Sequence, residues 1–183
     1  MKISTASWWL ASIAFVTLLA PVSSHAVSKH KLDARARTTL ASLYASRPAV
    51  RSLVQGSAGV LVFPRVYKAG IGIGGEYGEG VLLQGGHTSG YYNIVSGSIG
   101  FQLGGQQRSV VIAFTSAKAL AKFKQTKGWK AGVDGSAVIA KVGTGGEIDT
   151  NTANQPVIAF ILGERGLMYN ATLEGSKISR MDK

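Results

Sequence analysis

Residues 59–105 decide the fold and read GVLVFPRVYKAGIGIGGEYGEGVLLQGGHTSGYYNIVSGSIGFQLGG. Short apolar, β-prone runs alternate there with glycine, and Gly70, Gly72 and Gly74 stand at every second position. Because successive side chains of a strand point to opposite faces, these glycines leave one face of the strand bare. Such a face lets another element approach closely or lets the sheet bend sharply. The stretch therefore predicts a glycine-rich, bent β-sheet.

The alternation of short apolar runs with glycine-rich turns continues to the end of the chain. Strands are predicted at residues 59–63, 69–75, 80–83, 90–95, 98–103, 109–114, 129–142, 157–162, 167–173 and 177–181. Residues 143–155 are polar and rich in turn formers. Helical patterns do not alternate with these strands, which argues against a doubly wound sheet.

The first helical pattern covers residues 28–46. Its apolar stripe has steps of four, four and three residues and consists of Leu32, Ala36, Leu40 and Leu43. Pro48 is expected to end the helix, because the residue before proline avoids helical angles. Residues 49–55 are expected to add a short helical turn.

A second helical pattern covers residues 117–127, with an N-cap candidate at Thr115-Ser116 and Gly128 at its end. No linker rich in proline, serine or charge divides the chain, so residues 27–183 are predicted to form one domain. The predicted fold class is α+β. We expect a curled or double-layered, mainly antiparallel β-sheet with an N-terminal amphipathic helix and one internal helix.

Residues 1–26 have the features of a secretory signal peptide. Lys2 gives a basic start, residues 8–20 are almost wholly apolar, and Ser24-His25-Ala26 places small residues at positions −3 and −1 of a cleavage site. The alternative is a membrane anchor, which needs about 20 apolar residues, more than this run supplies. The chain has no cysteine, which excludes a lipidated cysteine and a disulfide framework. The predicted location is periplasmic or secreted, free or associated with a membrane.

The charge of the chain is strongly positive. Removing residues 1–26 takes away only Lys2, so 19 Lys and Arg remain against 9 Asp and Glu, a net charge of +10. This balance favours anionic lipid, another polyanion or nucleic acid as partner. Export argues against nucleic acid. A net charge also keeps a protein soluble, so the alternative that it serves solubility alone stays open.

The sequence predicts no catalytic residue and no cofactor. Residues 70–75 match the G-x-G-x-x-G dinucleotide fingerprint, but the Glu-Tyr-Gly-Glu-Gly that follows cannot open the helix that holds a pyrophosphate. His30 and His87 lie beside no plausible nucleophile. A hydrolase or a nucleotide-binding enzyme is therefore disfavoured.

Two groups of carboxylates are candidates for a site. Glu76 and Glu79 suggest paired carboxylates for acid–base chemistry, and Asp134, Glu147 and Asp149 suggest ligands for a hard metal ion. Neither group has the spacing of a known motif. Solvated charges in turns are the favoured interpretation, and no metal site is predicted.

Basic residues at the start of the chain suggest a membrane contact. Lys29, Lys31, Arg35 and Arg37 make residues 28–46 a basic amphipathic helix of the kind that lies on anionic membranes. In the alternative interpretation, the helix packs its narrow apolar stripe on the domain and leaves its charges in water.

A second basic group lies farther along the chain. Arg65 and Lys68 surround a predicted turn and, together with Lys118 and Lys122, suggest a cationic surface. Tyr67 or the Tyr91-Tyr92 pair would supply amphipathic contacts there, because tyrosine has an apolar body and a polar end. The alternative is that the tyrosines belong to the core and the lysines are scattered.

Several separated motifs occur in order along the chain. They are residues 59–65, residues 68–80, Gly90-Tyr-Tyr, Ser98-Ile-Gly-Phe-Gln-Leu-Gly-Gly-Gln, Gly166-Leu-Met and Leu173-Glu-Gly-Ser-Lys. Together they resemble the SYLF lipid-binding domain family over about residues 29–181. The resemblance implies a non-enzymatic domain that binds lipid through a basic surface and an amphipathic N-terminal segment. The positions that match this segment are Lys29, Lys31, Arg35 and Arg37.

Eukaryotic members of that family bind phosphoinositides, and some fungal members also bind and bundle actin. This chain differs from them in its signal peptide and in having no partner module such as an SH3 or FYVE domain, so it resembles the stand-alone exported bacterial form. We therefore expect it to bind anionic phospholipid or phosphoinositide-like head groups at a membrane surface. The alternative is a structural or protein-interaction domain of the cell envelope, with a protein partner.

Overall fold

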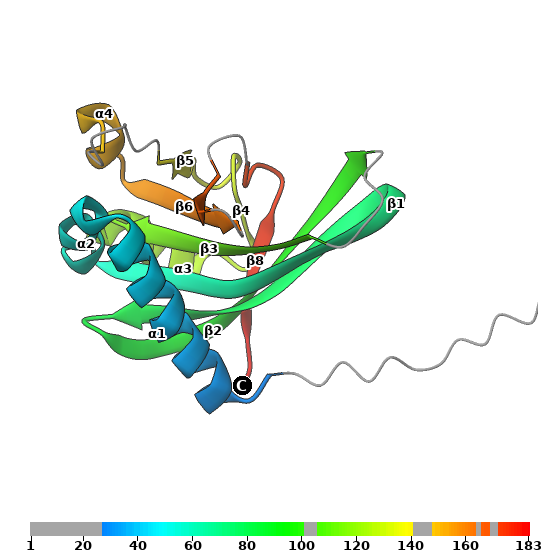
Figure 1. Cartoon of the computed structure of the whole chain (residues 1–183), viewed down its shortest axis with the longest axis horizontal. Coiled ribbons are helices and arrows are strands. Elements are labelled where there is room, and N and C mark those ends of the chain that lie inside the picture. The colour runs from blue at the N-terminus through cyan, green and yellow to red at the C-terminus, as the bar shows by residue number, and fades with distance from the viewer. Residues whose placement is uncertain (1–26, 101–105, 141–147, 164–165, 169–171) are drawn as a thin grey trace, which may run out of the picture.

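The computed structural model of the protein describes residues 27–100, 106–140, 148–163, 166–168 and 172–183. The predicted signal peptide and parts of the strands predicted at 98–103, 129–142 and 167–173 lie outside these residues. The described chain combines helices with a curled eight-stranded sheet, which confirms the α+β class (Figure 1). None of the helices in these ranges is long and apolar enough to cross a membrane.

The helices are α1 (Lys29–Ser46), α2 (Pro48–Gln55), α3 (Ala117–Gln125) and α4 (Thr150–Ala153). The strands are β1 (Gly59–Gln84), β2 (His87–Gly100), β3 (Gln106–Phe114), β4 (Trp129–Lys130), β5 (Val138–Ile139), β6 (Val157–Gly163), β7 (Gly166–Leu167) and β8 (Lys177–Met181). The sheet has the order β4-β8-β2-β1-β3-β6-β5, and β7 pairs with β6. All pairs are antiparallel except β5 with β6, so the prediction of a mainly antiparallel sheet is confirmed.

The 26-residue β1 organises the sheet by folding back on itself (Figure 1). Its first half pairs with β3 as far as Lys68, and its second half pairs with β2 from Gly72 onward. The halves lie against each other, because a Cβ atom added to Gly80 would come within 2.5 Å of the Phe63 ring. The glycine run thus lies where β1 exchanges one neighbour for the other, and the predicted bend is confirmed.

Several predicted strands are longer or shorter than expected. Residues 59–63, 69–75 and 80–83 all belong to β1, because pairing continues past Pro64 with only a register shift between Phe63 and Val66. Residues 129–142, in contrast, hold only the short β4 and β5 in their described part. The chain turns between them at Gly132, whose φ of 87° is a left-handed value that glycine adopts without strain.

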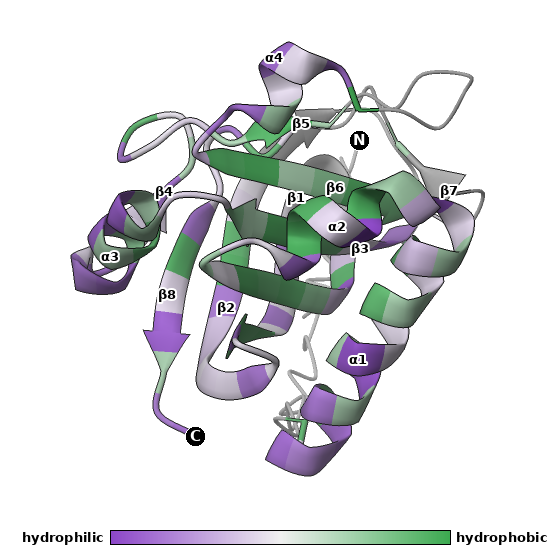
Figure 2. Ribbon diagram, turned by 90° about the vertical axis from the view of Figure 1, so that its left-hand side faces the viewer, coloured by the Kyte–Doolittle hydropathy of each residue, from purple (hydrophilic) through white to green (hydrophobic). Residues whose placement is uncertain are grey.

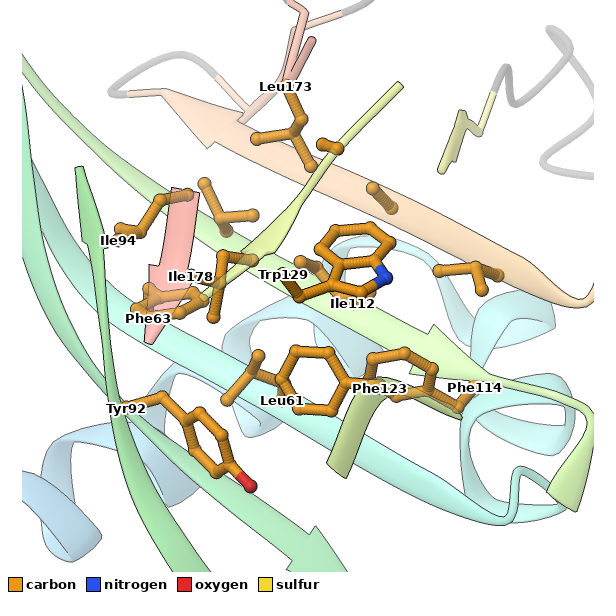
Figure 3. Packing of buried hydrophobic residues seen from close by; sticks show 14 of the residues in the cluster. Leu61, Phe63, Tyr92, Ile94, Ile112, Phe114, Phe123, Trp129, Leu173 and Ile178 are labelled. Carbon is orange, nitrogen blue, oxygen red and sulfur yellow. The ribbon is translucent and has the colours of Figure 1, made fainter. Parts of the chain in front are cut away.

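The concave inner face of the sheet holds one hydrophobic cluster (Figure 3). Helix α3 closes this face with Leu120 and Phe123, which are 4% and 2% exposed. The Phe123 ring lies 4.8 Å from Phe114, 5.0 Å from Tyr92 and 5.8 Å from Trp129, measured between ring centroids. The prediction of an internal helix is confirmed, and its Ser116 N-cap accepts a hydrogen bond from the Ala119 amide.

The outer face carries a second cluster, to which α1 and α2 contribute. Leu32, Ala36 and Leu43 of α1 are at most 2% exposed and pack over β1. Helix α1 ends at Ser46, before Pro48, as predicted, and the short helical turn predicted at residues 49–55 is α2, which begins at Pro48. The apolar stripe of α1 is therefore buried in the domain, in agreement with the packed-helix alternative.

Candidate functional site

Polar contacts fix the first half of α1 on the sheet. Asp33 accepts hydrogen bonds from the Thr88 hydroxyl at 3.0 Å and from the Tyr91 hydroxyl at 3.1 Å. The Lys29 ammonium lies 5.9 Å from the centre of the Tyr91 ring, and the Arg37 guanidinium donates to the Gly86 carbonyl at 3.3 Å. In this conformation α1 has no free apolar stripe to insert into lipid, so it can offer a membrane only its charges.

The four basic residues predicted on α1 lie on two sides of the helix. Residues two positions apart are separated by about 200° around a helix axis. Lys29 and Arg37 therefore flank the buried stripe on the side of Asp33, while Lys31 and Arg35 flank it on the other side. Lys31 is exposed and Arg35 is half-buried. The helix thus presents two small groups of cations rather than one basic face.

The prediction that Arg65 and Lys68 surround a turn is wrong. Both residues lie inside β1, next to the register shift where Pro64 is accommodated by pairing with β3. Arg65 is exposed and Lys68 is half-buried. Tyr67 is 50% exposed and points to the face opposite Lys68, because side chains alternate along a strand.

Lys118 and Lys122 do not share a surface with the cations of α1. Both are exposed on α3, which covers the inner face of the sheet, whereas α1 covers the outer face. Figure 2 shows the two helices on opposite sides of β2 and β8. The predicted site residues therefore fall into three separate places: α1, the middle of β1, and α3.

Two exposed lysines that the sequence reasoning missed lie side by side at the edge of the sheet. Lys130 of β4 is the direct antiparallel partner of Lys177 of β8. Each is next to a buried residue, since Trp129 is 2% and Ile178 is 1% exposed. The alternation of these buried and charged residues was a usable signal, but the strand pairing that joins them was not visible in the sequence.

The glutamates of β1 are not solvated turn charges, contrary to the expectation. Glu76 is 8% exposed and accepts from the Arg108 guanidinium at 2.5 Å. Glu79 lies 2.9 Å from the Lys183 ammonium and also accepts from the Val27 amide at 3.3 Å. The two carboxylates stand three positions apart on a strand, so they point to opposite faces and cannot act as a pair.

The other carboxylates considered as metal ligands serve local structure. Asp134 accepts a hydrogen bond from the Lys130 amide at 2.7 Å, and Asp149 caps α4 by accepting from the Asn151 and Thr152 amides. Glu147 lies outside the described residues. Within those residues, no group of three or more His, Asp or Glu side chains is placed to hold a metal ion.

The tyrosines proposed as amphipathic contacts differ in environment. Tyr92 is 4% exposed in the inner core, and burial raises the pKa of its hydroxyl. Tyr91 is half-buried beside α1; burial and then the hydrogen bond to Asp33 raise its pKa. Among the described tyrosines, Tyr67 and Tyr77 are the exposed ones, at 50% and 47%. The Tyr91-Tyr92 pair therefore serves packing, in agreement with the core alternative.

A shallow hollow of about 580 Å³ lies between α2 and α4. Its lining is Ala49, Ser52, Leu53, Ile148 and Ala153. None of these side chains is ionisable, so the hollow offers no charge to a phosphate group and no acid or base for catalysis.

Part of the chain is similar in sequence to a known protein family. The sequence pattern of the Ysc84 family, described as Las17-binding protein actin regulator, matches residues 95–183. This match supports the resemblance of the chain to the SYLF family. The matched SYLF segment includes β3, α3, β4, β6 and β8, and so includes Lys118, Lys122, Lys130 and Lys177. SYLF domains bind lipid or actin and are binding domains rather than known enzymes. A search of curated proteins found no match to the chain.

Proposed function

We propose that this protein binds anionic phospholipid or phosphoinositide-like head groups at a membrane surface and catalyses no reaction. The family supports lipid or protein binding in general. The signal peptide predicted at residues 1–26 supports a periplasmic or secreted location. The phosphates of phosphatidylglycerol, cardiolipin or lipopolysaccharide would then be the groups that lysine and arginine contact.

The observation that carries this proposal is the difference in environment between the ion-paired glutamates and the exposed basic residues. Both ion pairs among the described residues hold a nearly buried glutamate, Glu76 or Glu79, and they use only Arg108 and Lys183. Exposed cations such as Lys31, and the lysines of α3, β4 and β8, have no described carboxylate as ion-pair partner. These two glutamates thus serve the fold, while cations such as Lys31, Lys118, Lys122, Lys130 and Lys177 are exposed.

The contact would be mainly electrostatic. Each lysine or arginine near an anionic membrane contributes about 1 kcal/mol of attraction, and salt weakens exposed contacts of this kind. Because the apolar stripe of α1 is covered, insertion of this helix does not contribute in the described conformation. Lys29, Lys31, Arg35 and Arg37 remain proposed contacts through their charges. Arg65 and Lys68 in β1, and Lys118 and Lys122 on α3, lie at separate places and are not proposed to share this contact.

Cosedimentation with vesicles tests the proposal. The protein, expressed from its full gene and with its N-terminus determined by mass spectrometry, is mixed with vesicles of phosphatidylcholine alone or with added phosphatidylglycerol, cardiolipin or a phosphoinositide, at low and high salt. We expect binding to anionic vesicles and none to phosphatidylcholine. Absence of binding to every anionic vesicle at low salt would contradict the proposal and favour a protein partner in the envelope.

A further inference from the structure

The outer face of the sheet is only partly covered. Near α1, β2 is held through Tyr91, whose hydroxyl donates to Asp33. Farther along β2, Val95 is 45% exposed although Ile94, its neighbour on the inner face, is fully buried. In the described residues no helix packs over this second half of β2 or over β8, which lie between α1 and α3 (Figure 2).

Four exposed side chains form one line across this open face. Tyr77 of β1 is paired with Val95 of β2, Val95 is paired with Lys177 of β8, and Lys177 is paired with Lys130 of β4. We call these four residues the cross-strand row. Neighbouring strands lie about 4.8 Å apart, so the row spans roughly 14 Å. It begins with an aromatic and an aliphatic side chain and ends with two ammonium groups.

The position of the two lysines of the row lowers the stability of the fold. Like charges directly opposite each other on neighbouring strands are destabilising. Asp134 lies close by, but its carboxylate accepts from the backbone amide of Lys130, and Lys177 has no described carboxylate as ion-pair partner. A pair of cations kept together in this way is complementary to a group with more than one anionic oxygen, such as a phosphate.

No carboxylate among the described residues makes an ion pair with a lysine of the row. Glu79 lies on the same face and accepts a hydrogen bond from the Tyr77 hydroxyl at 3.2 Å, and the Lys183 ammonium lies 2.9 Å from its carboxylate. Helix α1, with Lys29 and Lys31 in its first turn, begins on the same outer face. The open face therefore joins exposed apolar area to an excess of positive charge.

We propose that the cross-strand row is the part of this protein that contacts an anionic lipid surface. Lys130 and Lys177 bind head-group phosphates, while Tyr77 and Val95 enter the interfacial layer, where an aromatic side chain with a polar end is favoured. This inference rests on the proposed function and assigns its main contact to the sheet, rather than to α1 or α3.

The first test compares two double variants of equal charge change. Lys130→Gln with Lys177→Gln removes the cations of the row, and Lys118→Gln with Lys122→Gln removes two exposed cations from α3. With phosphatidylcholine vesicles that contain phosphatidylglycerol, we expect the row variant to bind about 30-fold more weakly than the unchanged protein. The α3 variant should lose less than about threefold. Circular dichroism and thermal melting establish that both variants are folded.

The second test reports contact directly. Because the chain has no cysteine, Val95→Cys creates a single position for an environment-sensitive fluorophore. Ala121→Cys, exposed on α3, is the matched control. We expect a blue shift and a rise in emission for the label at position 95 when anionic vesicles are added. The label at position 121 should keep the spectrum that it has in buffer.

The results separate this inference from the proposed function. If the unchanged protein binds anionic vesicles but both double variants lose affinity equally, or only the label at position 121 responds, the row is not the contact although lipid binding stands. If the unchanged protein binds none of the anionic vesicles, both proposals are overturned.

Discussion

The outer face of the sheet has two halves, which differ in whether helices cover their apolar side chains. Over β1, the apolar side chains Val62, Val81 and Leu83 are covered by helices and are at most 6% exposed. Around β2 and β8, Val95 of β2 and Tyr77 at the far end of β1 are nearly half exposed, and Lys177 of β8 is paired with Lys130 of β4. The covered half stabilises the domain. The open half contributes little to stability, which is the pattern expected of a surface kept for a partner.

The comparison also shows why α1 is a poor candidate for insertion into a membrane. Its apolar residues already belong to the outer cluster, and releasing them would expose both the stripe and the strand residues beneath it. The open half needs no such rearrangement before it meets a partner. We therefore regard α1 as the cover of one half and as a source of charge beside the other.

The largest expected difference between the halves is in stability. Leu43→Ala, in the covered half, should lower the free energy of unfolding by about 2–5 kcal/mol, because Leu43 is fully buried and the change leaves a cavity. Val95→Ala, in the open half, should lower it by less than about 1 kcal/mol. Chemical denaturation measures both. Equal losses would mean that the open half is packed in solution.

A smaller effect is expected at the border of the two halves. Tyr91→Phe removes the hydrogen bond to Asp33 and should cost about 1 kcal/mol at neutral pH. The pKa of Tyr91 is raised in the folded protein, first by burial and then by Asp33, so the folded state keeps a proton that the unfolded state loses near pH 10. The stability from this shift is present below about pH 10 and is lost as the pH rises toward the folded-state pKa.

Chemical denaturation of the unchanged protein and of Tyr91→Phe, repeated in steps of about one pH unit from about pH 8 to about pH 11, tests this expectation. The advantage of the unchanged protein should shrink above about pH 10. Tyr67→Phe, at an exposed tyrosine, serves as the control. A difference that stays constant over this range would show that Tyr91 does not link α1 to the sheet by its hydroxyl.

The smallest effect should have the opposite sign. Lys130→Gln removes one of two like charges on paired strands and should raise the free energy of unfolding by about 0.2–1 kcal/mol. The gain should decrease with added salt, because salt screens the repulsion that the substitution relieves. Lys118→Gln, on α3, should change stability less. A loss of stability in Lys130→Gln would mean that the lysine pair supports the fold.

Much of the fold could be predicted from local patterns. The stripe of α1, Pro48 as the end of the first helix and Ser116 as the cap of α3 are all short-range signals, and all are present in the structure. The breaks predicted inside β1 failed because pairing with two neighbours keeps Pro64 and the glycines in an extended strand. The turn predicted around Arg65 failed for the same reason.

The candidate site was less accessible to prediction. Lys118 and Lys122 were correctly placed on one exposed side of a helix, but the face of the sheet that receives α3 depends on how the strands curl. Glu76 gave no local sign of burial, because its partner Arg108 lies 32 residues away along the chain. Lys130 and Lys177 meet only through the pairing of β4 with β8.

The sequence by itself determined the α+β class, the positive charge and the helices, since composition and short-range periodicity carry these properties. Only the tertiary structure decided which cations lie together, which carboxylates are neutralised inside the domain and which apolar side chains stay uncovered. The physical reason is that charge and exposure at a surface depend on contacts between residues far apart in the chain. One strand pairing placed two lysines opposite each other, and one packed helix covered the stripe that a membrane would otherwise receive.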